Sequence, residues 1–467
     1  MTNDNNIILH SDSYKLSHYK QYQPGTTKVR SYFESRIGAL YPETVFFGLQ
    51  YFLRKYLQGR VVTPDKIAAA ESIARIHLGG GQGTFNRAGW EHIEKKYNGF
   101  LPVEIRAVPE GTRVPTSNVL MTIENTDDEC YWLTNYLETL LVQVWYPSTV
   151  ATVSNYVYQK IRENLDATGD PSGLPFKFHD FGFRGASCPE AAGIGGLAHL
   201  VNFSGTNTLA ALTTGINYYD SGICGFSIPS SEHSTITSWG KDHELDAFRN
   251  MLDQYPEGLV ACVSDSYDIG HACSQLWGTD LKQKILDRKG TLIVRPDSGD
   301  IVATVIFCLN KLGAKFGTYL NAKGFRCLND HVRLIQGDGC MPQTISLLLE
   351  ALKAKTWSGD NITFGMGGGL LQRLNRDTQV FAFKCCSTTV DGVDHDVWKD
   401  PVGAPEKASK RGILKLVYND AGALTTVAQD APGEDVMRTV FRNGEITQLD
   451  TFDEIRKRAQ SSSLVLT

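Results

Sequence analysis

The sequence lacks an excess of charge of either sign. Its 467 residues carry 46 Lys and Arg against 51 Asp and Glu, which gives a formal net charge of −5. A protein that binds duplex nucleic acid usually carries a basic excess that neutralises phosphates, so this near-balance argues against that class. The chain is not a disordered acidic polymer either, because 42% of its residues are hydrophobic and 10% are aromatic.

The chain also lacks any apolar run near the ~20 residues that a membrane-spanning helix needs. Its polar start, MTNDNNIILHSDSYK, has no charged segment leading into an apolar stretch, so we expect no secretory signal. The ten cysteines form no CxxC pair and no framework spacing, which argues against a disulfide scaffold or a zinc ribbon. We therefore expect a soluble cytoplasmic protein with reduced thiols.

Glycine is in surplus. It accounts for 44 of 467 residues, which is about 9.4% against an average near 7%. The length allows about two to four domains, although an α/β barrel alone can take about 250 residues. What matters for function is whether the extra glycines are scattered or gathered in loops.

From about residue 176 the sequence repeats one pattern, in which a short apolar or β-branched run ends in polar or glycine residues and a helical stretch follows. The eight runs are 176–182, 199–206, 225–234, 259–268, 291–300, 332–339, 362–369 and 380–387. Strands that alternate with helices predict a parallel sheet. We predict a (β/α)8-like barrel over an open doubly wound sheet, because each run carries its functional-looking residues at its C-terminal end.

The two flanks of this region have a different pattern. Residues 1–150 mix helical stretches with extended segments such as 101–109. Four short strands are expected after residue 411, and Asn443-Gly444 between the last two is typical of a type I′ hairpin. Thr451 and Glu454 predict a capping box for a closing helix.

These patterns predict an α/β protein with three regions. The N-terminal mixed α+β region covers 1–150, the barrel covers 151–390, and a C-terminal β meander covers 391–467. The meander is expected to pack with the N-terminal region, so that both chain ends build a second domain.

Two glycine loops, QGDG (336–339) and GMGGG (365–369), follow the sixth and seventh runs. Late loops of a barrel commonly form a phosphate site, because glycines let backbone N–H groups approach the anion and the next helix adds its dipole. Each loop could instead be a tight turn, but two at adjacent positions favour phosphate binding.

Charged residues stand at the ends of two other runs. Arg295 could grip a phosphate and Asp297 could bind ribose hydroxyls or balance positive charge on a sugar, although the two could also form a surface ion pair. Asp265 and Asp268 suit Mg²⁺ or sugar hydroxyls, but they could equally cap the next helix. His233 could transfer protons or accept a phosphoryl group, although a lone histidine is more often structural.

An aromatic ring and an arginine follow the first run. Phe181 and Arg184 could stack and orient a flat ring, or they could be a core residue and a salt-bridge partner. The stretch that contains Lys399 and Lys407 is rich in cations. It could be a lid over a polyphosphate or a solvated surface loop.

With these residues laid out, the sequence resembles the nicotinamide phosphoribosyltransferases, which are type II phosphoribosyltransferases, over nearly its whole length. Several matching segments are long and chemically unusual, which makes the resemblance specific. They are 12–22, 31–36, 46–53, 129–147, 179–185, 227–244, 263–269, 293–300, 335–339, 364–372 and 399–402.

The resemblance implies that the enzyme joins nicotinamide to 5-phosphoribosyl 1-pyrophosphate, with Mg²⁺, and produces nicotinamide mononucleotide and pyrophosphate in NAD salvage. It also implies a homodimer whose two active sites lie at the subunit interface, and ATP as a co-substrate. No nucleic acid or membrane partner is expected.

The resemblance also assigns roles to residues of this sequence. Phe181 would stack on one face of the pyridine, Tyr14 with Asp12 would cover the other face from the partner subunit, and Arg184 would contact the amide. His233 would be phosphorylated by ATP, with Asp265 orienting it. The remaining substrate contacts would come from Arg295 and Asp297 at the ribose and pyridine, from Gly337, Asp338, Gly367 and Gly368 at the ribose 5′-phosphate, and from Arg36, Arg376, Lys384, Lys399 and Lys407 at the pyrophosphate or ATP phosphates.

One position departs from the family. Where the family typically has aspartate in a GTDT segment, this chain has Asn207 in GTNT. The aspartate accepts a hydrogen bond from the amide of nicotinamide and repels the carboxylate of nicotinic acid, whereas an asparagine carries no charge and can donate N–H groups. A nicotinate or dual-specificity enzyme is therefore the first alternative, and a non-catalytic phosphosugar-binding dimer is the second.

Overall fold

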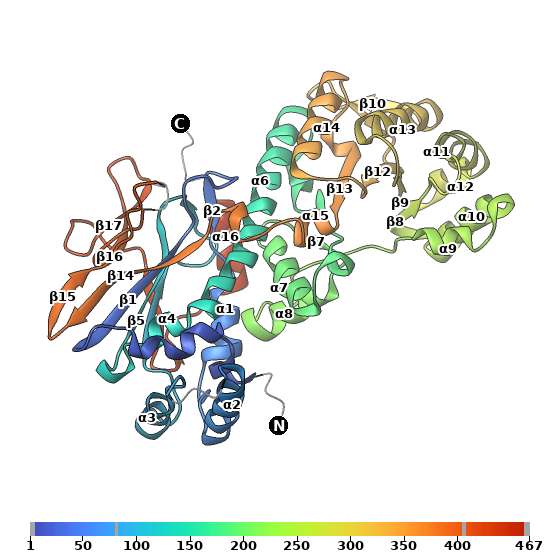
Figure 1. The fold of residues 1–467 in the computed structure, drawn as a ribbon. Helices are drawn as coiled ribbons and strands as arrows, with labels where there is room; N and C mark the ends of the chain where they lie inside the picture. Colours follow the sequence, from blue (N-terminus) through green and yellow to red (C-terminus); the bar gives the residue numbers. More distant parts are fainter. Residues whose placement is uncertain (1–4, 80–82, 404–407, 462–467) are drawn as a thin grey trace. The chain divides into compact units, whose positions relative to one another are not determined.

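The structure is a computed structural model that describes residues 5–79, 83–403 and 408–461. The chain divides into two compact units (Figure 1). The terminal unit comprises Met1–Thr152, Ile216–Ser221 and Asn375–Thr467, and the central unit comprises Val153–Gly215 and Gly222–Leu374. Both chain ends thus build one unit, as the sequence predicts.

The terminal unit is organised around a seven-stranded sheet in which every pair of neighbours is antiparallel. Its strand order is β15 (Val393–Asp396), β14 (Ala382–Val390), β1 (Thr26–Glu34), β5 (Val119–Asn125), β3 (Val103–Ala107), β18 (Arg438–Arg442) and β19 (Glu445–Ile446). Tyr32 and Phe33 of β1 are fully buried, and the ring of Phe33 stacks on Phe381 with centroids 5.0 Å apart. This apolar packing joins segments from the two ends of the chain.

Shorter elements complete the terminal unit. Its longer helices are α2 (Pro64–His77), α3 (Arg87–Tyr97) and α16 (Phe452–Gln460), and small two-stranded sheets pair β2 (Glu43–Val45) with β4 (Arg113–Pro115) and β16 (Leu414–Tyr418) with β17 (Leu424–Ala428). Asn443 and Gly444 both have positive φ, 51° and 84°, which confirms the type I′ hairpin. The capping box of Thr451 and Glu454 is confirmed at the start of α16.

The predicted C-terminal meander is wrong in its connections. β18 pairs with β3 rather than with β17, so the two C-terminal hairpins belong to different sheets. A hairpin is fixed by its own turn, but the next partner of an edge strand depends on which apolar face it covers. Here that partner comes from the N-terminal region.

The central unit contains a six-stranded parallel sheet. Its order is β7 (Gly205–Thr206), β6 (Phe178–Asp180), β13 (Ile362–Met366), β12 (Val332–Gln336), β9 (Lys289–Arg295) and β8 (Glu257–Val263). Leu292, Leu334 and Phe364 are buried in the central strands, as expected for a sheet covered by helices. The main helices are α7 (Pro189–Leu200), α10 (Glu244–Gln254), α13 (Ile301–Phe316) and α14 (Pro342–Ala354).

The structure has this six-stranded parallel sheet where the sequence predicts an eight-stranded barrel. The third run makes only two isolated bridges, from Phe226 to Gly205 and from Ser230 to Ala261, which reach both edge strands. The eighth run is β14, and it pairs antiparallel with β1 in the terminal unit. Only the short helix α15 (Gly368–Leu371) and a 3₁₀ turn (Arg376–Thr378) separate β13 from β14, too little chain for a crossover that returns to the parallel sheet. The predicted end of the barrel at residue 390 is therefore wrong.

The chain has two further helices, α6 (Trp145–Thr168) and α8 (Leu209–Tyr219). No helix among the described residues is both long enough and apolar enough to cross a membrane.

Candidate active site

A cleft of about 340 Å³ opens in the central unit, where β6, β9, β12 and β13 end. Its walls contain both glycine loops that the sequence singles out. Phe181, Arg184, Arg295 and Asp297 also line it. The carboxyl ends of neighbouring parallel strands meet at one edge of a sheet, which is why residues far apart in sequence converge here.

The ring of Phe181 is seated on glycine backbone. The backbone N–H of Phe181 donates to the carbonyl of Met366 at 2.9 Å, which fixes the loop after β6 to the end of β13. A Cβ placed on Gly365 would lie 2.0 Å from Cε2 of the ring, and one on Gly337 would lie 3.4 Å from the same atom. Position 365 therefore has to be glycine for the ring to lie where it does, whereas position 337 is only in contact with it, and the half-buried ring can present an aromatic surface to the cleft.

Arg295 and Asp297 form a tight pair at the end of β9. Nη2 of Arg295 donates to both carboxylate oxygens of Asp297, at 2.9 and 3.0 Å. The guanidinium carbon also lies 5.7 Å from the centroid of the Phe181 ring. Both side chains are mostly buried, so the pair belongs to the wall of the cleft rather than to the outer surface.

Two arginines in the cleft are unpaired. Among the described residues, neither Arg184 nor Arg373 takes part in a side-chain hydrogen bond or an ion pair, and both are exposed. Arg373 lies just after α15, whose first N–H groups have no acceptor within the helix. Sequence reasoning missed Arg373. Its position a few residues after the GMGGG loop is the only signal that could have pointed to it.

His233, at the start of the short helix α9 (His233–Thr237), faces two carboxylates. Its Nε2 lies 3.2 Å from Oδ1 of Asp265, and its Nδ1 lies 3.9 Å from Oδ2 of Asp297. Oδ2 of Asp265 accepts hydrogen bonds from the backbone N–H of Asp297 and the hydroxyl of Ser298, at 2.9 and 2.6 Å. Because a carboxylate only accepts, Asp265 selects the tautomer with a proton on Nε2 and leaves the lone pair on Nδ1.

The neighbouring acidic residue has a structural role. Oδ1 of Asp268 accepts from the N–H of His271 at 2.9 Å and caps the helix α11 (Ile269–His271). Of the two readings that the sequence left open for this residue, the structure supports the helix cap.

Asn207 is exposed, and a neighbouring side chain orients it. Its Oδ1 accepts a hydrogen bond of 2.6 Å from the hydroxyl of Ser227, while its backbone N–H donates to the carbonyl of Asp180 at 2.9 Å. Asp180 is buried, and burial raises the pKa of its carboxyl although Thr206 and the N–H of Gly182 donate to it. The bond from Ser227 uses one of the two lone pairs of the Asn207 oxygen, and the N–H₂ group of Asn207 points away from it with both donors available.

The predicted phosphate-binding cations lie in the terminal unit. Lys384 of β14 is half-buried, and its pKa is lowered first by burial and then by the charges of Arg36, Lys399 and Arg376, while the charge of Glu138 raises it. The three other cations therefore lie near enough to Lys384 to repel its charge. Lys407 lies outside the described residues.

The other predicted residues of the terminal unit are near its N-terminus. Tyr14 is 59% exposed in the 3₁₀ helix Ser13–Lys20, and Asp12 accepts a hydrogen bond from Thr139 at 2.8 Å. The predicted residues therefore form two sets, one in each unit.

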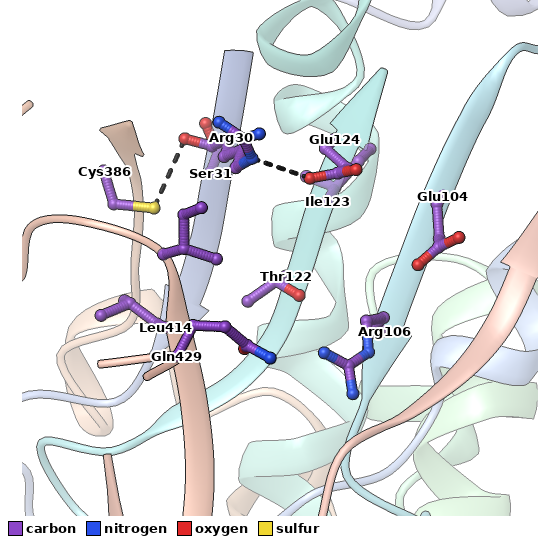
Figure 2. A pocket seen from close by; sticks show the side chains of 11 residues that line it. Arg30, Ser31, Glu104, Arg106, Thr122, Ile123, Glu124, Cys386, Leu414 and Gln429 are labelled. Carbon is purple, nitrogen blue, oxygen red and sulfur yellow. Dashed lines mark hydrogen bonds and ion pairs between the residues drawn. The ribbon is translucent and has the colours of Figure 1, made fainter. Parts of the chain in front are cut away.

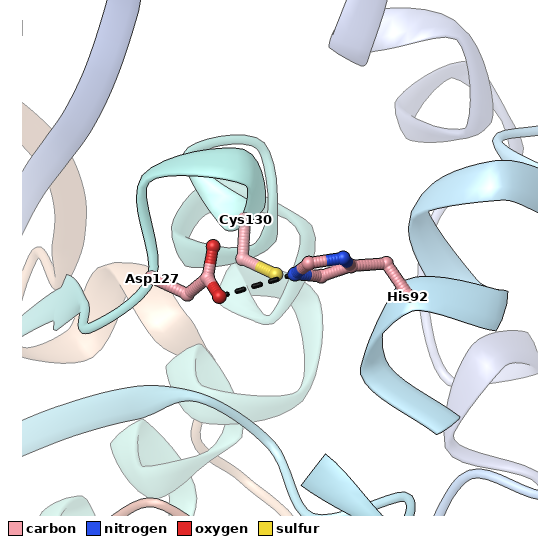
Figure 3. A group of neighbouring side chains, drawn as sticks. All are labelled: His92, Asp127 and Cys130. Atoms are coloured by element: carbon pink, nitrogen blue, oxygen red, sulfur yellow. Dashed lines mark hydrogen bonds and ion pairs between the residues drawn. The ribbon is translucent and has the colours of Figure 1, made fainter. Parts of the chain in front are cut away.

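One group of three potential metal ligands occurs among the described residues, His92, Asp127 and Cys130 (Figure 3). Oδ2 of Asp127 already accepts from Nζ of Lys96 at 2.6 Å and from the hydroxyl of Tyr97, as well as lying 3.1 Å from Nε2 of His92. Burial raises the pKa of the Cys130 thiol, which disfavours the thiolate that a metal needs. The group is thus a hydrogen-bonded structural centre.

A second cavity, of about 220 Å³, lies in the terminal unit against β1, β5 and β3 (Figure 2). Its charged walls are neutralised from within the unit. Arg30 pairs with Glu124 at 2.9 Å, and Arg106 pairs with Asp435 at 2.9 Å. This cavity therefore offers an incoming ion little uncompensated charge.

Comparison with known proteins identifies the family of the chain. The model of the nicotinate phosphoribosyltransferase (NAPRTase) family matches residues 176–445, and that of the nicotinamide phosphoribosyltransferase N-terminal domain matches residues 6–105. A nicotinamide phosphoribosyltransferase of Xanthomonas campestris is 49% identical over 98% of this chain and 99% of its own length. One of Acinetobacter baylyi is 33% identical over 96% and 95%.

Solved structures share the fold at low sequence identity. Human nicotinic acid phosphoribosyltransferase is 15% identical, with a TM-score of 0.60 over 96% of this chain and 93% of its own. The glycine loops, the seated aromatic ring and the family matches together lead to one conclusion. The chain belongs to the nicotinate phosphoribosyltransferase (NAPRTase) family, and it is a phosphoribosyltransferase.

Proposed function

We propose that the protein transfers the phosphoribosyl group of 5-phosphoribosyl 1-pyrophosphate to nicotinamide and releases nicotinamide mononucleotide and pyrophosphate, as a step of NAD salvage. The observation that carries this proposal is the cleft itself, in which an aromatic ring on glycine backbone stands beside two glycine loops and two unpaired arginines. The relatives that match nearly the full chain bear the name of this activity.

The proposed chemistry needs positioning more than a protein nucleophile. The ring nitrogen of the pyridine forms a bond to C1 of the ribose while the bond from C1 to the pyrophosphate oxygen breaks and pyrophosphate leaves with the electron pair. Phe181 would stack on the pyridine, and the loops at Gly337 and Gly367 would hold the 5′-phosphate. Asp297 would balance the positive charge that develops on the sugar.

The leaving pyrophosphate needs cations. The family resemblance assigns this role, or binding of the ATP phosphates, to Arg36, Arg376, Lys384 and Lys399 of the terminal unit, and to Lys407 from the stretch that contains Lys399. Mg²⁺ prefers phosphate oxygens and would enter with the phosphoribosyl donor. In the proposed homodimer, Tyr14 and Asp12 of one copy would complete the pyridine site of the other. The homodimer, the magnesium and the cytoplasmic location stay predictions.

His233 would couple the reaction to ATP. Asp265 holds a proton on Nε2, so the lone pair on Nδ1 is available to attack the γ-phosphorus. The bond from this phosphorus to the oxygen of ADP would break, and ADP would leave with the electron pair. Phosphorylation would then add charge beside Arg295 and Asp297 and tighten the hold on the substrates.

A second candidate activity follows from Asn207. The Ser227 hydroxyl uses one of the two lone pairs of its oxygen and fixes the orientation of the amide, which leaves both N–H donors to meet a substrate. Two N–H donors suit the carboxylate of nicotinic acid at least as well as the amide of nicotinamide. This contact favours a nicotinate or dual-specificity enzyme over strict selection of nicotinamide.

The proposal is tested with the purified protein, Mg²⁺ and the phosphoribosyl donor. Pyrophosphate release should require a pyridine acceptor, and kcat/KM should be compared for nicotinamide and nicotinic acid. A preference for nicotinic acid would replace the first proposal with the second. Binding of both substrates without pyrophosphate release would instead identify a non-catalytic phosphosugar-binding protein.

A further inference from the structure

One carboxyl group beside the His233–Asp265 pair has no part in the scheme above. Glu244 is the first residue of α10, only 6% of the residue is exposed, and its Oε1 is fully buried. Among the described residues, no donor forms a hydrogen bond with this oxygen and no cation pairs with the side chain. Burial without donors costs far more free energy for a carboxylate than for a protonated carboxyl, because only the carboxylate carries a charge.

The groups around Glu244 add to this cost. Burial raises the pKa of Glu244 to about 7, and the charges of Asp268 and Asp265 contribute in the same direction. On β8, the pKa of Cys262 is raised to about 12 by its own burial, with a smaller contribution from the charge of Glu244. Further charged or titratable groups on the packed elements are exposed His233 on α9, exposed Lys241, Asp242 and His243 in the turn before α10, exposed Glu257 at the start of β8, and buried Cys273 and exposed Asp280 in the π-helical segment Ala272–Asp280.

We infer that Glu244 controls the charge near the His233–Asp265 pair, and that it holds a proton so that this acidic pocket can admit an anionic phosphoryl donor. The inference rests on the proposed phosphorylation of His233 by ATP. It adds a proton site that none of the roles above requires.

The physical reason lies in the charge of the pocket. Arg295 neutralises Asp297 within 3.0 Å, so Asp265 is the main uncompensated negative charge that faces the imidazole. An ionised Glu244 would place a second one beside it, in a region from which water is largely excluded. Phosphate groups of ATP would then approach against two like charges, and their binding would weaken.

The test compares the pH dependence of ATP binding in the wild type and in Glu244→Gln, which is close in shape and always neutral. Calorimetry with ATP and Mg²⁺ between pH 6 and 8.5 should show that the wild-type Kd rises about three- to tenfold as the pH passes 7. The Kd of Glu244→Gln should lack this rise and keep only the pH dependence that the ionisation of ATP gives to both proteins, so the difference between the two proteins reports on Glu244. Glu257→Gln is the matched control, since Glu257 is 73% exposed at the start of β8.

A second measurement does not depend on the variant binding ATP. With ¹³C-labelled glutamate, the carboxyl signal that disappears in Glu244→Gln should titrate near pH 7 in the wild-type protein. A titration near pH 4.5, or the same pH dependence of ATP binding in both proteins, would overturn the inference. Labelled ATP separates it from the proposed function. If His233 is not phosphorylated but ATP binding still depends on Glu244 as described, the coupling fails and the proton site stands.

Discussion

Substituting Gly365 by alanine should displace the aromatic ring on which the pyridine is proposed to stack. The new Cβ would lie 2.0 Å from Cε2, 2.3 Å from Cδ2 and 2.7 Å from Cζ of Phe181. Gly365 is in β13 and is paired on one side with His179 of β6, while β12 holds the other edge of the strand. The backbone cannot retreat, so the ring has to move.

The expected loss follows from the cost of overpacking. Adding a methyl group to a well-packed site costs about 1–3 kcal/mol. If the ring has to return against this strain for the pyridine to stack, the same range corresponds to a fall of about 5- to 150-fold in kcat/KM for the pyridine. The fall should appear when the pyridine is varied and should be smaller when the phosphoribosyl donor is varied, because the glycine loops keep their backbone. Thermal unfolding measured beside the kinetics separates loss of stacking from loss of stability.

Gly173→Ala is the matched control in the same unit. Its added Cβ would meet only Cε of Lys177 at 3.7 Å, an ordinary contact, so its kinetics should stay within about twofold of the wild type. Wild-type kinetics in Gly365→Ala, in a folded protein, would refute the assignment of Phe181 as the stacking surface.

Three further predictions follow from the site and from the structural centre. His233→Ala should lower the rate measured with ATP to the rate measured without it, and full stimulation by ATP in this variant would contradict the role of His233. Asn207→Asp should raise the ratio of kcat/KM for nicotinamide over nicotinic acid by about tenfold or more, because it restores a charge that repels the carboxylate; an unchanged ratio would remove Asn207 from specificity. Burial alone would raise the pKa of Asp127, but hydrogen bonds from Lys96, Tyr97 and His92 hold it well below its usual range. Its stabilising contribution is therefore present above pH ~4 and lost on further acidification, so Asp127→Asn should lower the free energy of unfolding by about 1–3 kcal/mol at pH 7 and by less at pH 3, in denaturant titrations.

Local features of the fold could be predicted from the sequence, whereas strand partners could not. The hairpin at Asn443-Gly444 and the cap at Thr451 depend on a few neighbouring residues, and both are confirmed. The eighth apolar run is indeed a strand, but its partner β1 lies more than 350 residues earlier in the chain. An alternating pattern states that one face is buried and does not state against what.

The site shows the same limit. The family resemblance predicts that Asp265 orients His233, and the structure puts Nε2 of His233 3.2 Å from Oδ1 of Asp265. Arg373 and Glu244 were missed. Arg373 matters because its side chain lies in the cleft without a partner among the residues that the structure describes. Glu244 matters because its carboxyl is buried and no donor in that part of the chain forms a hydrogen bond with Oε1. Neither property is visible in residue type or spacing.

The central claim is that this chain forms the bond between a pyridine and phosphoribose. The most direct measurement is the release of pyrophosphate from 5-phosphoribosyl 1-pyrophosphate by the purified protein, with nicotinamide, nicotinic acid or no acceptor. We predict release that depends on nicotinamide and yields an equal amount of nicotinamide mononucleotide. No release with either pyridine, from a folded protein that binds the donor, would contradict the account.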